Sequence, residues 1–205
     1  MIAIIDYGIG NLGSIYNMLK KNGSEAIITS SIEEISKAKK LILPGVGSFD
    51  YGMLKLRESG LIDLLNQKVV IGETPILGIC LGMQLFTNRS EEGNSKGLGW
   101  IDAQTVKFNM QGDNSKLKIP HMGWNRIAIK KQSVLLNDMY EDARFYFVHS
   151  YYVQCNQQED ILTTTEYGFE FHSGLEKGNI AGVQFHPEKS HKFGLRFLKN
   201  FAESF

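Results

Sequence analysis

The chain of 205 residues contains little cysteine, little proline and no excess of charge. Its two cysteines, Cys80 and Cys155, lie far apart, so they suggest neither a disulfide framework nor closely spaced metal ligands. Lysine and arginine together number 22, as do aspartate and glutamate, which argues against nucleic acid or an anionic membrane as a partner. No apolar run approaches the roughly 20 residues that cross a bilayer. We therefore expect a reduced, cytoplasmic protein that forms one domain over residues 1–205.

Strand-like and helix-like segments alternate along the first half of the chain. Short apolar runs at residues 2–6, 26–28, 41–43 and 76–79 are followed by helical patterns at 14–22, 32–38, 51–67 and 81–87. This alternation is typical of parallel βαβ units. After a polar loop at 88–99, strands are expected at 103–108, 125–129, 145–148, 151–154, 161–165 and 180–185, and a helix at 192–205. The pattern predicts an α/β fold: an open, mostly parallel sheet flanked by helices, with antiparallel strands in the second half.

The most informative stretch is Gly78-Ile79-Cys80-Leu81-Gly82, which joins an apolar strand to the start of a helix. A sharp turn of this kind imposes strained backbone angles on its apex, and a glycine two residues away on each side leaves room for it. Hydrolases expose a nucleophilic serine in the same way. A cysteine here also meets a helix N-terminus, which favours its thiolate. We predict that Cys80 is a nucleophile, although free cysteine is commonly a small buried hydrophobe.

A second glycine-rich segment, Pro44-Gly45-Val46-Gly47, directly follows the third strand. In open α/β sheets, ligands bind at loops on the carboxyl ends of parallel strands. Backbone N–H groups in this loop are therefore candidates to face an oxyanion next to Cys80. The alternative is an ordinary strand-to-helix connection.

The third element is Val183-Gln184-Phe185-His186-Pro187-Glu188, where a strand ends and delivers His186. A thiol needs a base, and the base needs a carboxylate that fixes its tautomer, so His186 and Glu188 supply both. These two residues and His191 are also possible metal ligands, but no further Cys or His cluster completes a site. His-x-Glu also opens the zinc-deaminase signature, yet no Pro-Cys-x-x-Cys follows.

The loop from Gly8 to Gly13 matches G-x-G-x-x-G between a strand and a helix, the fingerprint of dinucleotide binding. That function also needs an acidic residue at the end of the second strand. The second strand instead ends in Thr and Ser, and Glu33 is expected to be helical. A tight turn is the preferred interpretation, with a dinucleotide-binding oxidoreductase as the less favoured alternative.

The remaining histidines and the second cysteine are harder to interpret. His121 lies in a mixed apolar and polar segment suited to an exposed interface, and His149 follows a strand where it can meet a substrate. His172 and His191 are expected at the surface. Cys155 is expected to be structural rather than reactive.

Together these motifs resemble those of class I, triad-type glutamine amidotransferases, in the same order and over nearly the whole chain. The resemblance implies catalysis by Cys80, His186 and Glu188 and an oxyanion hole from Leu81 and the Val46 and Gly47 loop. It also implies no metal or organic cofactor, since ammonia is the leaving group and no redox change occurs. The positions implied to bind glutamine are Gly45, Gln84, His149, Ser150 and Tyr151.

Two segments, Pro120-His121-Met122-Gly123-Trp124-Asn125 and Tyr146-Phe147-Val148-His149-Ser150-Tyr151, point to one branch of that family. They resemble glutaminase subunits of histidine biosynthesis, which form a heterodimer with a (β/α)8-barrel cyclase and pass ammonia to it. The residues implied to face the cyclase are Asn11, Met122, Trp124 and Lys189. Similar subunits also supply ammonia to surface-sugar amidotransferases, and these motifs alone do not separate the two roles. A catalytically inactive scaffold is disfavoured because all three triad residues are present.

Overall fold

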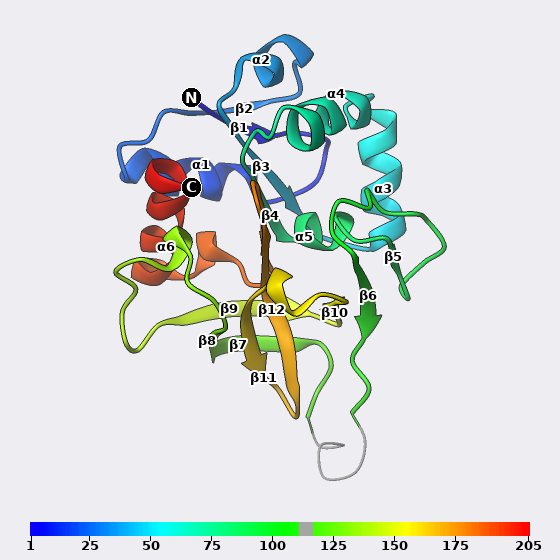
Figure 1. Cartoon of the computed structure of the whole chain (residues 1–205), viewed down its shortest axis with the longest axis vertical. Coiled ribbons are helices and arrows are strands. Elements are labelled where there is room, and N and C mark those ends of the chain that lie inside the picture. The colour runs from blue at the N-terminus through cyan, green and yellow to red at the C-terminus, as the bar shows by residue number, and fades with distance from the viewer. Residues whose placement is uncertain (111–116) are drawn as a thin grey trace.

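The computed structural model describes residues 1–110 and 117–205, and its first half is built on a parallel sheet. The strands β1 to β4 span Ile2–Ile5, Ala26–Thr29, Lys40–Gly45 and Ile76–Cys80, and β13 spans Ile180–Val183. They lie in the order β2-β1-β3-β4-β13, and all of these neighbours are parallel (Figure 1). The last strand in the chain thus completes the parallel part beside β4.

The same sheet continues mainly with antiparallel pairs. Beside β13 lie β12, β10 and β6, each antiparallel to its neighbour, and β11 pairs antiparallel with β12 and β8. At the far edge, β5 is parallel to β6. These strands span Arg89–Ser90 (β5), Ala103–Lys107 (β6), Ala128–Ile129 (β8), Tyr151–Cys155 (β10), Ile161–Glu166 (β11) and Glu170–Lys177 (β12). A separate antiparallel pair is formed by β7, His121–Arg126, and β9, Arg144–His149. Figure 1 shows this pair crossing the lower half of the molecule.

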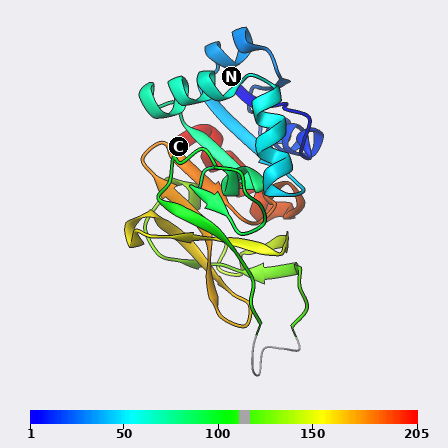
Figure 2. The ribbon, with the colours of Figure 1, turned by 90° about the vertical axis from the view of Figure 1, so that its right-hand side faces the viewer.

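Helices cover both faces of the parallel strands. Alternate residues of β1 enter two hydrophobic clusters: Ala3 and Ile5 face one, and Ile2 and Ile4 the other. Helices α2 (Ile32–Lys37), α3 (Phe49–Glu58), α4 (Ile62–Asn66) and α5 (Leu81–Leu85) pack on the first cluster, and α1 (Leu12–Lys21) and α6 (His191–Ser204) on the second. In Figure 1, α3 lies on one side of these strands and α1 and α6 on the other, and Figure 2 looks from the side of α3.

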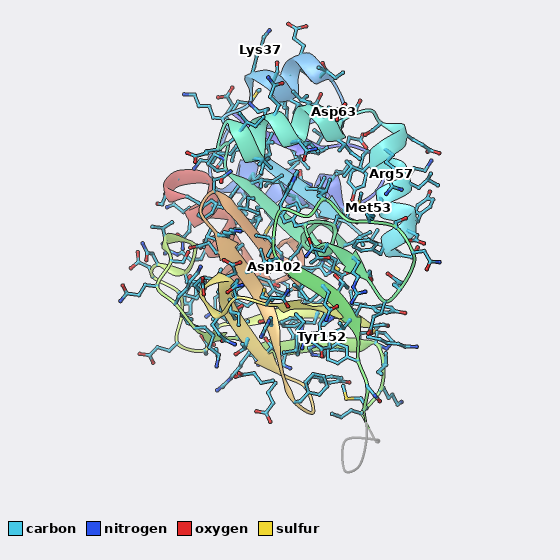
Figure 3. The ribbon with its side chains drawn as sticks, turned by 45° about the vertical axis from the view of Figure 1, so that its right-hand side comes forward. Lys37, Met53, Arg57, Asp63, Asp102 and Tyr152 are labelled. Carbon is cyan, nitrogen blue, oxygen red and sulfur yellow. The ribbon has the colours of Figure 1, made fainter. Side chains whose placement is uncertain are left out.

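The lower half of the molecule contains a cluster of aromatic side chains that includes Tyr152. Figure 3 places Met53, Arg57 and Asp63 on the helices of the upper half and Tyr152 on β10 in the lower half. The Tyr152 ring joins an aromatic cluster, with its centroid 4.8 Å from that of Phe108 and 5.6 Å from that of Phe169.

The described residues also form short helical turns: η1 (Gln67–Ile71), η3 (Val134–Leu136), η4 (Gln158–Asp160) and η5 (Pro187–Lys189).

The predicted fold class is confirmed, with several local corrections. The strand β12 was not predicted, because its charged ends and Gly174 obscure the apolar alternation. The helical pattern expected at 51–67 is two helices that separate near Gly60, and the first of them, α3, starts earlier, at Phe49. The strand expected from residue 125 is two strands, and β7 begins at His121. Over the described part of the chain, no helix has the length and apolar character that a membrane span requires.

Candidate active site

Cys80 lies at a strained turn between β4 and α5. It is the last residue of β4, and its φ of +55° and ψ of −112° place it in a region that non-glycine residues rarely adopt. A Cβ on Gly78 would lie 2.6 Å from the Phe86 ring, and a Cβ on Gly82 would lie 1.8 Å from the Leu43 carbonyl oxygen. Both glycines are therefore needed for the approach of α5 to the sheet, as the elbow interpretation requires.

The glycine-rich loop after β3 lies directly beside this elbow. Gly45 is in register with Cys80, and a Cβ on Gly45 would lie 2.8 Å from the Gly82 nitrogen. Gly47 has a φ of +98°, which favours glycine. The buried Tyr7 hydroxyl donates a hydrogen bond to the Pro44 carbonyl at 2.7 Å, so it fixes the start of the loop. Burial, and then the nearby Cys80 side chain, raise the pKa of Tyr7, which keeps the phenol neutral and able to donate.

His186 and Glu188 form a buried pair at the carboxyl end of β13. The Nδ1 atom of His186 lies 2.8 Å from the Oε1 atom of Glu188, and the two side chains are 2% and 1% exposed. Burial alone lowers the pKa of His186, but the Cys80 and Glu188 side chains outweigh it and raise this pKa to about 10. Among the described residues the His186 Nε2 atom has no hydrogen-bond partner. That nitrogen therefore remains available for Cys80.

The turn that carries His186 is fixed from two sides. The buried Ser190 hydroxyl donates to the His186 carbonyl at 2.6 Å and accepts a hydrogen bond from the Tyr146 N–H at 3.0 Å. In α6, a Cβ on Gly194 would lie 1.7 Å from the Pro187 carbonyl oxygen, so glycine allows α6 to pack on this turn. These two contacts hold the His186 turn in place.

A pair of buried glutamine side chains adjoins the thiol. The Nε2 atom of Gln184 lies 3.6 Å from the Cys80 Sγ atom. The Nε2 atom of Gln84 donates to the Gln184 Oε1 atom at 2.9 Å and to the Tyr151 carbonyl at 3.1 Å. The sequence singled out Gln84 as a substrate contact but gave Gln184 no role. The structure shows the amide nitrogen of Gln84 bound within the protein.

These elements enclose a cavity of about 330 Å³. Its lining includes ten of the predicted residues, from both halves of the chain: Val46, Gly47, Cys80, Leu81, Gln84, His149, Ser150, Tyr151, His186 and Lys189. Glu92, Pro120 and Val148 also line it and were not predicted. The Glu92 carboxylate accepts a hydrogen bond from the Phe49 N–H at 2.8 Å, and burial raises its pKa. Glu92 lies in a polar loop, where no sequence motif marked it as a site residue.

The remaining predicted residues lie outside the cavity lining. Glu188 lies behind His186, and Gly45 packs against the elbow. On β7, Met122 and Trp124 are 61% and 43% exposed. Asn11 precedes α1 and is half-buried.

Four expectations about isolated residues have clear outcomes. His121 is buried, so the expectation of an exposed position was wrong: residues alternate along β7, and His121 lies on its inner face. His172 is half-buried and accepts a hydrogen bond from the Cys155 N–H at 3.0 Å, so it is not a simple surface residue. His191 is exposed, as expected, and stacks on Trp124. Burial raises the pKa of Cys155 to about 12, which agrees with a structural role.

The loop between Gly8 and Gly13 has a packing explanation. The Gly8 N–H donates to the Asp6 carboxylate at 3.0 Å, and Gly10 has a φ of +120°. A Cβ on Gly10 would lie 3.0 Å from the Pro44 ring, so this glycine lets the loop reach the segment beside the elbow. Glu33 is in α2, as expected, which leaves the second strand without the acidic residue of a dinucleotide site. Over residues 1–110 and 117–205, no group of three His, Cys, Asp or Glu residues is placed to hold a metal ion.

Comparison with known proteins agrees with this geometry. The family model described as "Glutamine amidotransferase class-I" matches residues 3–205. The chain is 62% identical to imidazole glycerol phosphate synthase subunit HisH 2 of Methanococcus maripaludis, over 99% of both chains. It is 50% identical to HisH 2 of Pseudomonas aeruginosa, again over 99% of both. A solved glutamine amidotransferase shares the fold, with a TM-score of 0.74 and 18% identity over 98% of this chain and 99% of that one. The chain therefore belongs to the class I glutamine amidotransferase family, among the subunits of imidazole glycerol phosphate synthase named HisH.

Proposed function

We propose that this protein is the glutaminase subunit of imidazole glycerol phosphate synthase, which hydrolyses glutamine and passes the ammonia to a cyclase subunit. The observation that carries the proposal is the meeting of Cys80 and the His186–Glu188 pair at one cavity. The cavity lies at the carboxyl ends of parallel strands, where α/β folds bind ligands. Family membership at 62% identity to a named subunit supports the same assignment.

The first chemical step uses the thiol and the imidazole. The Nε2 atom of His186 accepts the proton of Cys80, and the thiolate attacks the side-chain amide carbon of glutamine. Negative charge then develops on the former amide oxygen. We propose that the Leu81 N–H stabilises it, together with an N–H at the peptide bond between Val46 and Gly47 once that peptide plane is turned inward. One such donor is typically worth roughly 3–4 kcal/mol of barrier.

The second step releases ammonia and regenerates the thiol. The imidazolium of His186 gives its proton to the leaving nitrogen, which breaks the carbon–nitrogen bond and leaves a glutamyl thioester. Water then attacks the thioester, His186 takes up its proton, and glutamate leaves as the thiol re-forms. Glu188 holds Nδ1–H throughout, so Nε2 is always the reacting nitrogen.

The polar lining of the cavity fits the amino-acid part of glutamine. Glu92 supplies a carboxylate, which is the natural partner of an α-ammonium group. Lys189 and the polar groups of residues 149–151 supply donors for the carboxylate of the substrate. We further propose that Gly45 and Gln84 act by shaping this cavity, since both contact other parts of the protein.

The partner surface is proposed to include Asn11, Met122, Trp124 and Lys189. Met122 and Trp124 expose apolar side chains on β7, and Lys189 lies at the cavity, with its ammonium 5.7 Å from the Tyr146 ring centre. A (β/α)8-barrel cyclase docked here would receive ammonia close to where it forms. We propose a single amidotransferase domain over residues 1–205. We place it in the cytoplasm because a free nucleophilic thiol needs a reducing compartment.

Reconstitution tests the pathway. The chain is mixed with the cyclase subunit of its own organism, glutamine and the nucleotide acceptor, and imidazole glycerol phosphate is measured. Formation of this product from glutamine is the expected result, and Cys80→Ala provides the negative control. Ammonia delivery to a surface-sugar amidotransferase, without activity alongside the cyclase, would reassign the acceptor and leave the glutaminase assignment in place.

A further inference from the structure

Two buried histidines on neighbouring strands form a hydrogen-bonded pair beside the cavity. The Nδ1 atom of His121, on β7, lies 3.0 Å from the Nε2 atom of His149, on β9. The exposed fractions of the two residues are 3% and 6%. In the mechanism above, neither ring transfers a proton. The partners at the two ends of the pair determine where each ring carries its hydrogen.

The inner end of the pair is set by a carbonyl group. The Nδ1 atom of His149 lies 2.8 Å from the Tyr151 carbonyl oxygen. A carbonyl only accepts, so His149 carries its hydrogen on Nδ1. The neutral ring then has a bare Nε2, which accepts a hydrogen bond from His121 Nδ1–H.

The outer end is set independently by Asn125. Its Oδ1 atom accepts from the Arg126 N–H at 2.8 Å, and its Nδ2 atom donates to the Glu166 carbonyl at 2.8 Å. These two backbone contacts fix the amide orientation, so the same Nδ2 group donates to the His121 Nε2 atom at 3.3 Å. His121 must therefore also carry its hydrogen on Nδ1. The donors and acceptors deduced from the two ends match at the contact between the rings.

The chain of hydrogen bonds continues from Tyr151 to the nucleophile. The Tyr151 carbonyl accepts from both His149 and Gln84, and Gln84 leads through Gln184 to the Cys80 Sγ atom. Around the pair, the rings of Phe147 and Tyr167 stack on His121 with centroids 4.8 and 4.1 Å away. This apolar packing favours the neutral rings, because a charged imidazolium is costly to bury.

We propose that His121 and Asn125 are positioning residues for glutamine binding, which act by bonding the Nε2 atom of His149 and so hold its ring, in the Nδ1–H tautomer, against the Tyr151 carbonyl. In that tautomer His149 fixes the Tyr151 carbonyl, and with it the residues 149–151 that line the cavity. Loss of the outer donors leaves the buried Nε2 atom of His149 without a partner, so the ring is no longer held and can rotate away from the Tyr151 carbonyl. The proposal rests on the proposed function only for the identity of the ligand.

The tautomers are measured directly by nitrogen-15 NMR of the histidine rings in the free wild-type protein. The expected result is that both His121 and His149 carry hydrogen on Nδ1, with a coupling across the bond between them. In His121→Phe, the Nδ1–H proton of His149 is expected to shift upfield, because its hydrogen bond to the Tyr151 carbonyl weakens, and an unchanged signal overturns the positioning role. A ring protonated on Nε2 in the wild type overturns the proposal, and this measurement needs no glutaminase activity.

Kinetics with two substitutions separate positioning from packing. His121→Phe keeps an aromatic ring between Phe147 and Tyr167 but removes the donor. His121→Asn loses the ring but places an N–H group near the former Nδ1. We expect His121→Phe to raise the KM for glutamine about tenfold with a smaller change in kcat, because a buried acceptor loses its partner. We expect His121→Asn to have the lower KM of the two, although it is the less stable protein.

Two further variants complete the test. Asn125→Ala removes the hydrogen bond to His121 at the partly exposed end of this series of hydrogen bonds, and it is expected to raise KM. This variant keeps the test possible if the buried substitutions at His121 prevent folding. His172→Phe, which removes a histidine hydrogen bond outside the cavity, is expected to leave KM unchanged. KM values that simply follow the melting temperatures overturn the positioning role. If the wild type hydrolyses no glutamine under any condition, the proposed function fails, and the NMR result still decides the tautomers.

Discussion

Gly82 packs against Leu43 so closely that a methyl group on Gly82 would lie 1.8 Å from the Leu43 carbonyl oxygen. Because that oxygen belongs to the backbone of a central strand, it has no room to move. We expect Gly82→Ala to destabilise the protein by more than about 3 kcal/mol and to abolish glutaminase activity. Urea unfolding of the purified variant measures the loss. Gly13→Ala is the matched control: a Cβ there meets nothing within 4 Å, so the helix should tolerate it.

Removal of the thiol tests the nucleophile. We expect Cys80→Ala to abolish glutamine hydrolysis while the fold and the binding of the cyclase persist, since only a small group at the cavity is lost. Steady-state glutaminase assays and a binding titration measure the two properties. Cys155→Ala is expected to retain activity, because Cys155 lies in β10 and outside the cavity lining. Glutaminase activity of Cys80→Ala within about tenfold of wild type would refute the assignment.

Neutralising Glu188 should shift the dependence of activity on pH. Burial lowers the pKa of His186, but Cys80 and Glu188 together raise it to about 10. Without the negative charge of Glu188 this pKa falls, so the imidazolium that protonates ammonia is lost at a lower pH. We expect Glu188→Gln to move the alkaline limb of kcat/KM to lower pH and to reduce kcat less than His186→Ala does. If the alkaline limb of the pH profile of kcat/KM is unchanged in Glu188→Gln, another group must orient His186.

Acid should destabilise the fold through the histidine pair. Burial lowers the pKa of His121 to about 4 and that of His149 to about 3, below the ordinary value of 6.5. The stability contributed by the neutral rings is complete above pH 6.5 and is lost as the pH falls through these values, since the unfolded chain binds the protons first. Each such proton adds up to about 1.4 kcal/mol of lost stability per pH unit. Urea unfolding of wild type at about pH 7 and about pH 5 measures the decrease. A smaller decrease is expected for His121→Phe.

The glutaminase should depend on its partner. Ammonia released without an acceptor becomes ammonium, which is no nucleophile, so an oxyanion hole completed only on docking prevents waste. The loop with Gly47 at a φ of +98° allows a peptide plane to turn. We expect the cyclase with bound acceptor to raise glutaminase activity at least about a hundredfold, roughly 2.7 kcal/mol. Assays with and without the cyclase and its ligand measure this ratio, and full activity of the subunit alone would contradict it.

The proposed catalytic residues could be singled out from the sequence because local sequence enforces their positions. Glycine is required on both sides of Cys80, because an added Cβ would lie 2.6 Å from the Phe86 ring at Gly78 and 1.8 Å from the Leu43 carbonyl oxygen at Gly82. A strand end followed by proline delivers His186. Gln184 and Glu92 were missed because their roles arise from contacts between distant segments, with Cys80 and with the Phe49 N–H. The location of His121 was misjudged because β7 is exposed on one face only, and its flanking residue Met122 is on the open face.

The position of β13 has a consequence for synthesis on the ribosome. Residues 180–183 insert beside β4, and His186 follows them, so the nascent chain keeps the edge of β4 unpaired until almost the whole sequence has emerged. An unpaired apolar strand edge is prone to aggregate, so translation pausing before residue 180 should create demand for a chaperone. The same order means that a nascent chain that ends before residue 186 holds the proposed nucleophile without its proposed base.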